Sequence, residues 1–328
     1  MSLHVAIVGC GLIGNKRAKA LGGCPLVAAV DTDHSRAQQF ASQFPGCTAG
    51  GDWREVVAHR DIELVIVATT NDMLAAVTLA AVRAGKHVLV EKPAARNAAE
   101  LEPAVAAARQ AGVVVKVGFN HRFHPAFLEA RKIVDSGALG PLMFVRARYG
   151  HGGRLEMEKE WRGNPEISGG GEMLDQGVHL IDLSRWFLGD FTEVVGRVVT
   201  FFWKWPVEDN GFAMLRSAGG QIAWLHASCT EWKNLFSFEI YGRDGKLHVE
   251  GLGGSYGVER LTFYKMLPQM GPPESKVWEY PGEDTSWKAE FAYLRACIEQ
   301  KRQPVGSLDD ALAALKVVQR LYEQSKVR

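Results

Sequence analysis

A glycine-rich turn near the start of the chain lies between a short apolar run and an alanine-containing segment. The turn reads Gly9-Cys10-Gly11-Leu12-Ile13-Gly14 and fits the spacing G-x-G-x-x-G. The run His4–Val8 before it predicts a strand, and the segment after it predicts a helix. In this context the first glycine permits a tight turn, the second lets a pyrophosphate approach the backbone, and the third allows close helix–strand packing. The turn therefore predicts a βαβ unit that binds a dinucleotide at the start of its helix.

The same alternation of strand and helix patterns continues through the first third of the chain. Further apolar runs lie at Leu26–Val30, Glu63–Ala68, His87–Val90 and Val113–Val117. Helical spacing appears between them, at Met73–Ala84 and Ala98–Ala111. Strands separated by helices favour a parallel sheet that is buried on both faces. We expect a doubly wound α/β Rossmann domain over residues 1–120.

The pattern changes beyond residue 120. A helix is expected at Pro125–Ser136, a strand at Leu142–Tyr149, a long loop at Gly152–Gly171 and a helix from Glu172 to Leu188. Strand patterns then follow one another at Val194–Trp205, Gly211–Ser217, Gln221–Cys229, Ser237–Tyr241 and Lys246–Glu250. Consecutive strands indicate a large, mainly antiparallel sheet.

Two helices, Trp287–Gln300 and Ser307–Gln324, are expected after these strands, and Ser307 is a suitable N-cap residue. We expect residues 121–328 to form an α+β domain with an open-faced sheet, which binds the substrate and contributes to oligomerisation. In this interpretation the last helices pack back on the first domain.

Composition and charge exclude several classes of partner. The 328 residues include 38 Lys and Arg and 37 Asp and Glu, so the formal net charge is +1. That balance gives no electrostatic reason to expect nucleic acid or a membrane surface as a partner. No apolar run approaches the roughly 20 residues that cross a bilayer, and the first residues favour a strand over a signal peptide.

The five cysteines are scattered and form no C-x-x-C pair. This pattern indicates neither a disulfide framework nor a zinc knuckle. A reducing, cytoplasmic setting is the expectation that follows.

Asp31 ends the second apolar run, close to the spacing of roughly 20 residues at which an acidic residue binds ribose hydroxyls. A carboxylate there repels a 2′-phosphate, which favours NAD over NADP. Arg36 could accommodate that phosphate, and Asp31 could instead cap the next helix. The predicted cofactor-binding residues are Gly9, Gly11, Leu12, Ile13, Gly14, Asp31, Arg36, Thr69, Asn71, Glu91 and Lys92.

Three residues suit the oxidation of an alcohol, in which a hydride leaves carbon and a proton leaves oxygen. His179 has the side chain that titrates nearest neutrality and is a candidate base. Asp175 precedes it by one helical turn and could orient the imidazole. Lys92 could stabilise alkoxide charge. Whether Lys92 or His179 takes the proton stays open.

Two other interpretations of these residues remain. Asp175 and His179 could form an ordinary contact along a helix. Glu172, Asp175 and His179 could hold a divalent ion, although a nicotinamide enzyme needs no metal when a lysine polarises the alcohol, and we expect none.

The tripeptide Glu91-Lys92-Pro93 after a strand, the N-terminal glycine turn and the segment Gly169–His179 together resemble the GFO/IDH/MocA oxidoreductase family. This family includes glucose–fructose oxidoreductase and inositol dehydrogenases. The resemblance extends over nearly the whole chain. It implies an NAD-dependent dehydrogenase acting on CH–OH groups, with Lys92, Asp175 and His179 at the catalytic positions and a cis peptide bond before Pro93.

Arginine and tryptophan side chains interleave in segments expected near the site, which suits a ligand with an anion and a ring face. The sequence therefore favours a nucleotide sugar, with oxidation at C3 as one option. A free sugar, a sugar acid or a cyclitol is the alternative, and a non-catalytic NAD-binding sensor is the second alternative. The predicted substrate-binding residues are Lys92, Asn120, His121, Arg122, Arg154, Trp161, Arg162, Asp175 and His179.

An open apolar sheet face tends to find a partner. Alternation along Val194–Trp205 would place Phe202 on such a face. With the family resemblance, this predicts a homodimer or homotetramer.

Overall fold

The structure, a computed structural model, describes residues 3–269 and 271–325. These residues form two compact units. Unit 1 takes in the chain up to Phe119, together with Glu166–Gly169 and Trp287–Leu312. Unit 2 takes in Asn120–Pro165, Gly170–Ser286 and the chain from Ala313 onward. The chain thus passes between the units more than once.

Unit 1 is built on a six-stranded parallel sheet with the order β3-β2-β1-β4-β5-β6. Its strands are β1 (Val5–Val8), β2 (Leu26–Val30), β3 (Thr48–Gly50), β4 (Leu64–Val67), β5 (His87–Val90) and β6 (Val115–Val117). The central strands β1 and β4 are buried along their whole length, as expected for a sheet covered on both faces. This strand order is that of the Rossmann fold, so the predicted fold of the first part of the chain is confirmed.

Helices complete unit 1. They are α1 (Leu12–Lys19), α2 (His34–Ala41), α3 (Trp53–Ala58), α4 (Asn71–Arg83), α5 (Ala98–Ala111) and α9 (Ser286–Glu299). The prediction missed β3, α2 and α3, which are short and too polar to show a clear apolar period. From α9, Phe291, Leu294 and Cys297 enter the same apolar core as strand β1.

Unit 2 contains an eight-stranded sheet with the order β14-β13-β12-β11-β7-β10-β9-β8. The strands are β7 (Leu142–Gly150), β8 (Phe191–Val199), β9 (Asn210–Ser217), β10 (Ile222–Ser228), β11 (Leu235–Gly242), β12 (Gly245–Glu250), β13 (Glu259–Lys265) and β14 (Glu274–Tyr280). Neighbouring strands are antiparallel except for the parallel pair β7 and β10. The predicted mainly antiparallel sheet is confirmed, although β13 and β14 were not expected.

The predicted C-terminal end of the strand Val194–Trp205 was wrong. The strand β8 stops at Val199. Beyond it, the carboxylate of Asp209 accepts hydrogen bonds from the backbone N–H groups of Phe201, Phe202 and Trp203 at 2.7 to 3.0 Å. These bonds hold the chain in a turn, so Phe202 is exposed on a loop and not on the sheet.

The helices and short helical turns of unit 2 are η1 (Asn120–Phe123), α6 (Pro125–Asp135), η2 (Met157–Lys159), η3 (Trp161–Gly163), η4 (Met173–Gly177) and α8 (Val178–Leu188). A four-residue helix, α7 (Pro165–Ser168), and the long helix α10 (Leu308–Ser325) belong partly to each unit. The hydroxyl of Ser307 accepts the Asp310 N–H at 3.3 Å, as predicted for an N-cap.

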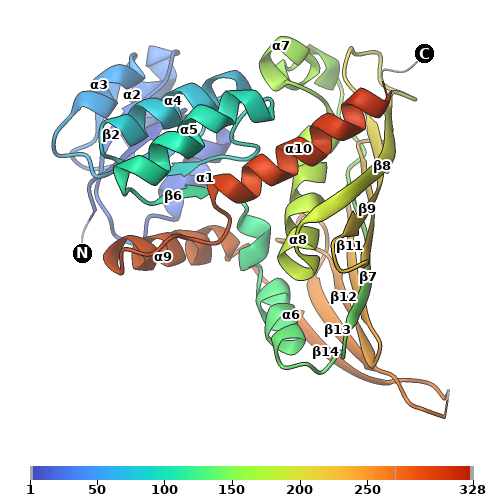
Figure 1. Cartoon of the computed structure of the whole chain (residues 1–328). Helices are drawn as coiled ribbons and strands as arrows, with labels where there is room; N and C mark the ends of the chain where they lie inside the picture. The colour runs from blue at the N-terminus through green and yellow to red at the C-terminus, as the bar shows by residue number, and fades with distance from the viewer. Residues whose placement is uncertain (1–2, 270, 326–328) are drawn as a thin grey trace. The chain divides into compact units, whose positions relative to one another are not determined.

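Helices α6 and α8 lie along one face of the eight-stranded sheet (Figure 1). The other face carries exposed apolar side chains. Val195 of β8, Met214 of β9 and Trp224 of β10 are in register and are each about half exposed. Among residues 3–269 and 271–325, no helix has the length and apolar character that would span a membrane.

Candidate active site

The glycine turn of unit 1 has the geometry that its spacing predicts. Gly9 has a φ of 99°, and a Cβ there would overlap the carbonyl oxygen of Ala68. A Cβ at Gly14 would overlap the carbonyl oxygen of Gly9. A Cβ at Gly11, by contrast, would meet no atom of the described chain within 4 Å. Gly9 and Gly14 are therefore needed for close backbone packing, while Gly11 faces open space.

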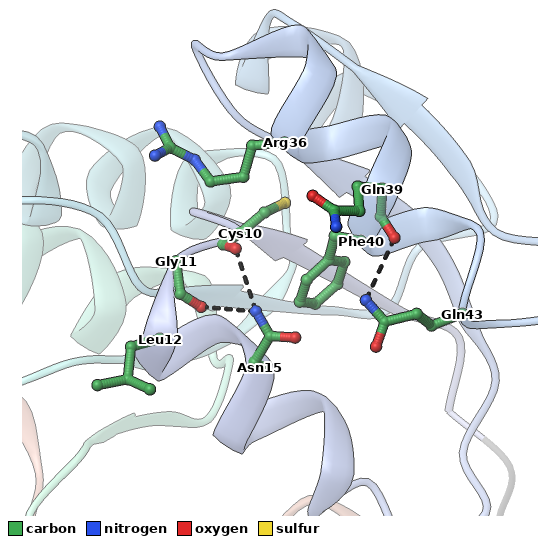
Figure 2. A pocket seen from close by; sticks show the side chains of 8 residues that line it. All are labelled: Cys10, Gly11, Leu12, Asn15, Arg36, Gln39, Phe40 and Gln43. Carbon is green, nitrogen blue, oxygen red and sulfur yellow. Dashed lines mark hydrogen bonds between the residues drawn. The ribbon is translucent and has the colours of Figure 1, made fainter.

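A pocket opens beside this turn and is framed by α1, α2 and the turn after α2 (Figure 2). Its lining residues are Cys10, Gly11, Leu12, Asn15, Arg36, Gln39, Phe40 and Gln43. The Asn15 amide donates to the carbonyls of Cys10 and Gly11 at 3.2 and 2.9 Å, which holds the turn in place. No side chain caps the N-terminus of α1 at Gly11. An open backbone, an uncapped helix start and a partly polar pocket fit a dinucleotide.

Asp31 follows β2 and is almost fully buried. Its carboxylate accepts from the Cys10 and Asp33 N–H groups, both at 2.9 Å, and from Arg36 Nε and Nη2 at 3.0 and 2.8 Å. Burial alone would raise the pKa of Asp31, but the hydrogen bonds from Arg36, Asp33 and Cys10 outweigh it and hold that pKa below its usual value. The carboxylate is therefore ionised and fixed next to the glycine turn.

Lys92 follows β5 and is half-buried. The peptide bond between Lys92 and Pro93 is cis, which confirms the expectation from the family resemblance. The neighbouring Glu91 is buried, and its carboxylate accepts from Arg17 Nε at 2.6 Å. The Glu91 side chain thus lies in the interior of unit 1, although it was predicted to bind cofactor.

The two predicted cofactor residues after β4 make contacts within unit 1. The Thr69 hydroxyl donates to the carbonyl of Thr70 at 3.1 Å. Asn71 begins α4, and its buried amide donates to the carbonyl of Ser168 at 2.8 Å. Asn71 therefore anchors the segment Glu166–Gly169 to the rest of unit 1.

The helix expected from Glu172 to Leu188 is interrupted in unit 2. Its first turn, η4, is a π-helix that contains Asp175, and α8 with His179 follows. Such turns are frequent at functional sites. Asp175 accepts from Arg162 Nε at 3.2 Å.

His179 is buried within a cluster of rings. Its ring centroid lies 3.8 Å from that of His121 and 6.2 Å from that of Tyr149, and the rings of His121 and Tyr149 are 5.2 Å apart. Burial raises the pKa of Tyr149 well above its usual value, and the neighbouring Tyr256 adds to the effect. Tyr149 is therefore a neutral hydroxyl at this cluster. Tyr149 is not among the predicted site residues, although its position at a strand end beside a glycine was a usable signal.

Two buried carboxylates flank the π-turn. Glu172 Oε1 lies 3.6 Å from His151 Nε2, and burial lowers the pKa of His151 below its usual value. Glu208 accepts from the N–H groups of Gly171 and Met173 at 2.9 and 3.1 Å and from the hydroxyl of Tyr322 in α10 at 2.7 Å. Glu208 thereby anchors the start of η4, and no local pattern in the sequence marks it for that role.

The remaining predicted substrate residues make contacts within unit 2. The Asn120 amide donates to the hydroxyl of Ser286 at 2.9 Å. Arg154 pairs with Glu160, using its Nε at 2.7 Å. The Arg162 guanidinium stacks on the ring of Trp161 at 4.5 Å.

Arg122, also predicted to bind substrate, pairs with a buried carboxylate. Its Nε and Nη2 donate to the carboxylate of Asp182 in α8 at 2.7 and 2.6 Å. Both side chains are at most 3% exposed. Arg122 is therefore held by Asp182 in the interior of unit 2.

No group of three or more His, Cys, Asp or Glu side chains suited to a metal ion occurs in the part of the chain that the structure describes. Glu172, Asp175 and His179 therefore do not form a metal-binding group of that kind. The chemistry available at the cluster is proton transfer and hydrogen bonding by imidazole, carboxylate and phenol groups.

The Rossmann sheet, its open glycine turn and a separate unit rich in acid–base side chains define a dinucleotide-dependent oxidoreductase. Residues 3–119 match the family model described as "Oxidoreductase family, NAD-binding Rossmann fold", and residues 127–248 match the GFO/IDH/MocA C-terminal domain. The chain belongs to the GFO/IDH/MocA family of oxidoreductases, and its first part is an NAD-binding Rossmann domain.

Three relatives illustrate the range of this family. Levoglucosan dehydrogenase of Pseudarthrobacter phenanthrenivorans is 26% identical over 284 residues, covering 75% of this chain and 73% of the relative. The 1,5-anhydro-D-fructose reductase of Ensifer adhaerens is 32% identical over 232 residues, covering 70% and 69%. The NADP⁺-dependent scyllo-inositol 2-dehydrogenase of Bacillus subtilis is 25% identical over 345 residues, covering 99% and 94%.

The solved structures show the same fold. Levoglucosan dehydrogenase in complex with NADH superposes with a TM-score of 0.89 at 23% identity, over 99% of this chain and 98% of that one. At this level of identity the likeness concerns the fold.

Proposed function

We propose that this protein is an NAD-dependent dehydrogenase that oxidises, or reversibly forms, a secondary hydroxyl of a free sugar or a cyclitol. The observation that carries the proposal is the buried His179, packed against His121 and Tyr149 and one turn from Asp175. A buried imidazole among polar rings suits proton transfer to and from a hydroxyl group. The nicotinamide, when bound, accepts the hydride.

The proposed roles divide among three residues. The Lys92 ammonium donates a hydrogen bond to the reacting oxygen and stabilises its developing negative charge. His179 exchanges the proton. Asp175, held by Arg162, binds a substrate hydroxyl or stabilises the charged imidazole. Either Lys92 or His179 could be the final proton acceptor, and the pH profiles of their variants would separate the two.

The charges of unit 2 support an uncharged substrate over the nucleotide sugar that the sequence favoured. Three arginines suggested an anionic ligand, namely Arg122, Arg154 and Arg162, but each pairs with a carboxylate of the chain itself. A diphosphate would have to displace those partners. The relatives are named for levoglucosan, anhydrofructose and inositol, which carry no phosphate.

A substrate panel tests this proposal. NADH formation is measured with inositols, free aldoses, sugar acids, anhydrosugars and UDP-sugars at equal concentrations. We expect activity with at least one phosphate-free polyol and none with UDP-sugars. Activity confined to UDP-sugars would contradict the substrate class. NADH binding without turnover of any polyol would favour the non-catalytic sensor.

The cofactor preference gives a second prediction. We propose that Asp31 selects NAD, because its ionised carboxylate repels a 2′-phosphate and binds a ribose diol. In Asp31→Ala, the ratio of the Kd for NADPH to the Kd for NADH should fall at least about tenfold, since Arg36 loses its partner and can bind phosphate. Fluorescence titration with both nucleotides measures it. Asp52→Ala, at the N-cap of α3, is the matched control and should leave the ratio unchanged, because Asp52 pairs with Arg54.

We propose that the protein forms a homodimer or homotetramer through the open sheet face that carries Val195, Met214 and Trp224. Trp224→Glu places a charge at one end of that apolar row and should shift the protein toward monomer in light scattering at micromolar concentration. Trp232→Glu is the control, because Trp232 is even more exposed than Trp224 but lies between β10 and β11. A wild-type protein that is monomeric would refute this assembly.

We propose that the protein is cytoplasmic, because of the state of its cysteines. All five are unpaired thiols in the structure. Burial raises the pKa of Cys10, with Asp31 adding to it, to about 12, and burial raises that of Cys47 to about 11. Thiols of this kind persist in a reducing compartment.

A further inference from the structure

A buried network of four charges lies in unit 1, and the proposed reaction makes no use of it. Arg17 of α1 donates through Nε to Glu91 at 2.6 Å and through Nη1 to Glu290 of α9 at 2.5 Å. Lys116 of β6 lies 2.9 Å from the other oxygen of Glu290. All four side chains are at most 9% exposed. The network thus holds two cations and two anions in balance.

Stability alone is a weak reason for such a network. Removing charged groups from water is costly, and well-packed apolar side chains of similar volume often stabilise a fold as well or better. Directional contacts are what charged pairs supply and apolar side chains do not. We therefore infer that the network orients a part of the chain, and its position in unit 1 indicates which part that is.

The Arg17–Glu91 pair joins the two functional segments of unit 1. Arg17 lies in α1, the helix that begins at the glycine turn. Glu91 is the residue before Lys92, and its N–H donates to the carbonyl of Val67 at 2.8 Å. The ring of Trp287 lies 4.4 Å from the Arg17 guanidinium and closes one side of it. A displacement of Glu91 would displace the peptide that carries Lys92.

Gly118 shows how tightly this pair is enclosed. A Cβ at that position would lie 2.5 Å from Arg17 Nη2 and 2.9 Å from Glu91 Oε2. Because both distances are too short, any other residue at 118 would push the ion pair aside. The backbone at the end of β6 therefore defines where the pair sits.

We propose that the Arg17–Glu91 ion pair is a positioning device, which holds the Lys92 peptide at a set place relative to the phosphate-binding helix α1. Arg17 and Glu91 act through Lys92 and touch neither substrate nor cofactor. The proposal rests on the proposed function, in which Lys92 polarises the reacting hydroxyl.

Two double variants of the full-length protein test it. Arg17→Met/Glu91→Leu removes one cation and one anion and leaves the Lys116–Glu290 pair balanced. Lys116→Met/Glu290→Leu, the matched control, also removes one charge of each sign but keeps the Arg17–Glu91 bond. Both variants are compared with the wild type in thermal unfolding, in NADH titration, and in kcat and KM with the best polyol. The labelling rate of the Lys92 amine is measured in each by peptide mapping.

We expect Arg17→Met/Glu91→Leu to lower kcat at least tenfold and to change the Lys92 labelling rate at least threefold, with little change in KM. The control should retain kcat and labelling within twofold. Equal losses in both variants, or wild-type kcat and labelling in Arg17→Met/Glu91→Leu, would overturn the proposal. If Arg17→Met/Glu91→Leu does not fold, Gly118→Ala replaces it, because the added methyl group displaces the ion pair without removing a charge. Gly118→Ala should also lower kcat and alter the Lys92 labelling rate.

The labelling rate separates this inference from the proposed function. If Lys92→Met retains turnover, Lys92 is not catalytic and the proposed function fails. A changed labelling rate in Arg17→Met/Glu91→Leu would then still show that the pair positions Lys92, while an unchanged rate would refute the positioning as well.

Discussion

Replacing Lys92 with methionine should lower kcat by about 100- to 1000-fold while NADH binding stays within threefold of the wild type. Methionine keeps the length and packing of the side chain but cannot donate a hydrogen bond or carry a charge. Removing one preorganised donor to a developing oxyanion costs a factor of this size.

His179→Ala should lower kcat by about 100- to 10,000-fold, because it removes the general acid–base group. Stopped-flow measurement of hydride transfer, with NADH fluorescence for binding, checks both.

The chain offers a matched control at the other end of the same strand. Lys86 directly precedes β5, as Lys92 follows shortly after it, and its ammonium donates to the carbonyl of His59 at 2.7 Å. Lys86→Met should leave kcat within twofold. Near-normal turnover in Lys92→Met would be incompatible with the proposed reaction, whereas a loss of NADH binding would point to a role of Lys92 in the cofactor site.

Breaking the Arg122–Asp182 pair should cost about 3 to 5 kcal/mol of the free energy of unfolding, because the remaining charge stays buried without its partner. Both Arg122→Met and Asp182→Leu should show this loss in urea unfolding. The pair ties η1, which carries His121, to α8, which carries His179. The single variants should therefore also lose activity.

The double variant Arg122→Met/Asp182→Leu removes both charges and should recover most of the lost stability. The exposed pair Arg154–Glu160 is the control, and its loss in Arg154→Met should cost less than about 1 kcal/mol. Arg122→Met with unchanged stability but a raised KM would restore Arg122 to the substrate site and contradict its interior role.

The local patterns of unit 1 were readable because they depend on neighbours in sequence. A strand, a G-x-G-x-x-G turn and a helix can form one dinucleotide site within a short stretch of chain, and the open space at Gly11 agrees with that prediction. The strand β5 and the helix α5 were likewise placed correctly. The cis bond at Pro93 was expected from the family resemblance and not from a local pattern. The end of β8 was not, because Asp209, which turns the chain there, lies several residues further on.

The candidate site was only partly predictable. Residue type and strand-end position pointed to His121, and Tyr149 lay within reach of the same reasoning. The partner of each charge was not predictable. Arg122 reads in sequence like any arginine of a ligand site, but its partner Asp182 is some sixty residues away.

The amino-acid sequence by itself determined the class of fold, the dinucleotide turn and the family, since these depend on periodicity and on short motifs with strict steric needs. Only the tertiary structure decided which polar groups form ion pairs and hydrogen bonds inside the protein. Glu91 pairs with Arg17, Arg122 with Asp182, and Glu208 with the start of the π-turn. The physical reason is that a charged side chain can leave water only where the fold places a partner group beside it. Residues distant in sequence supply those partners.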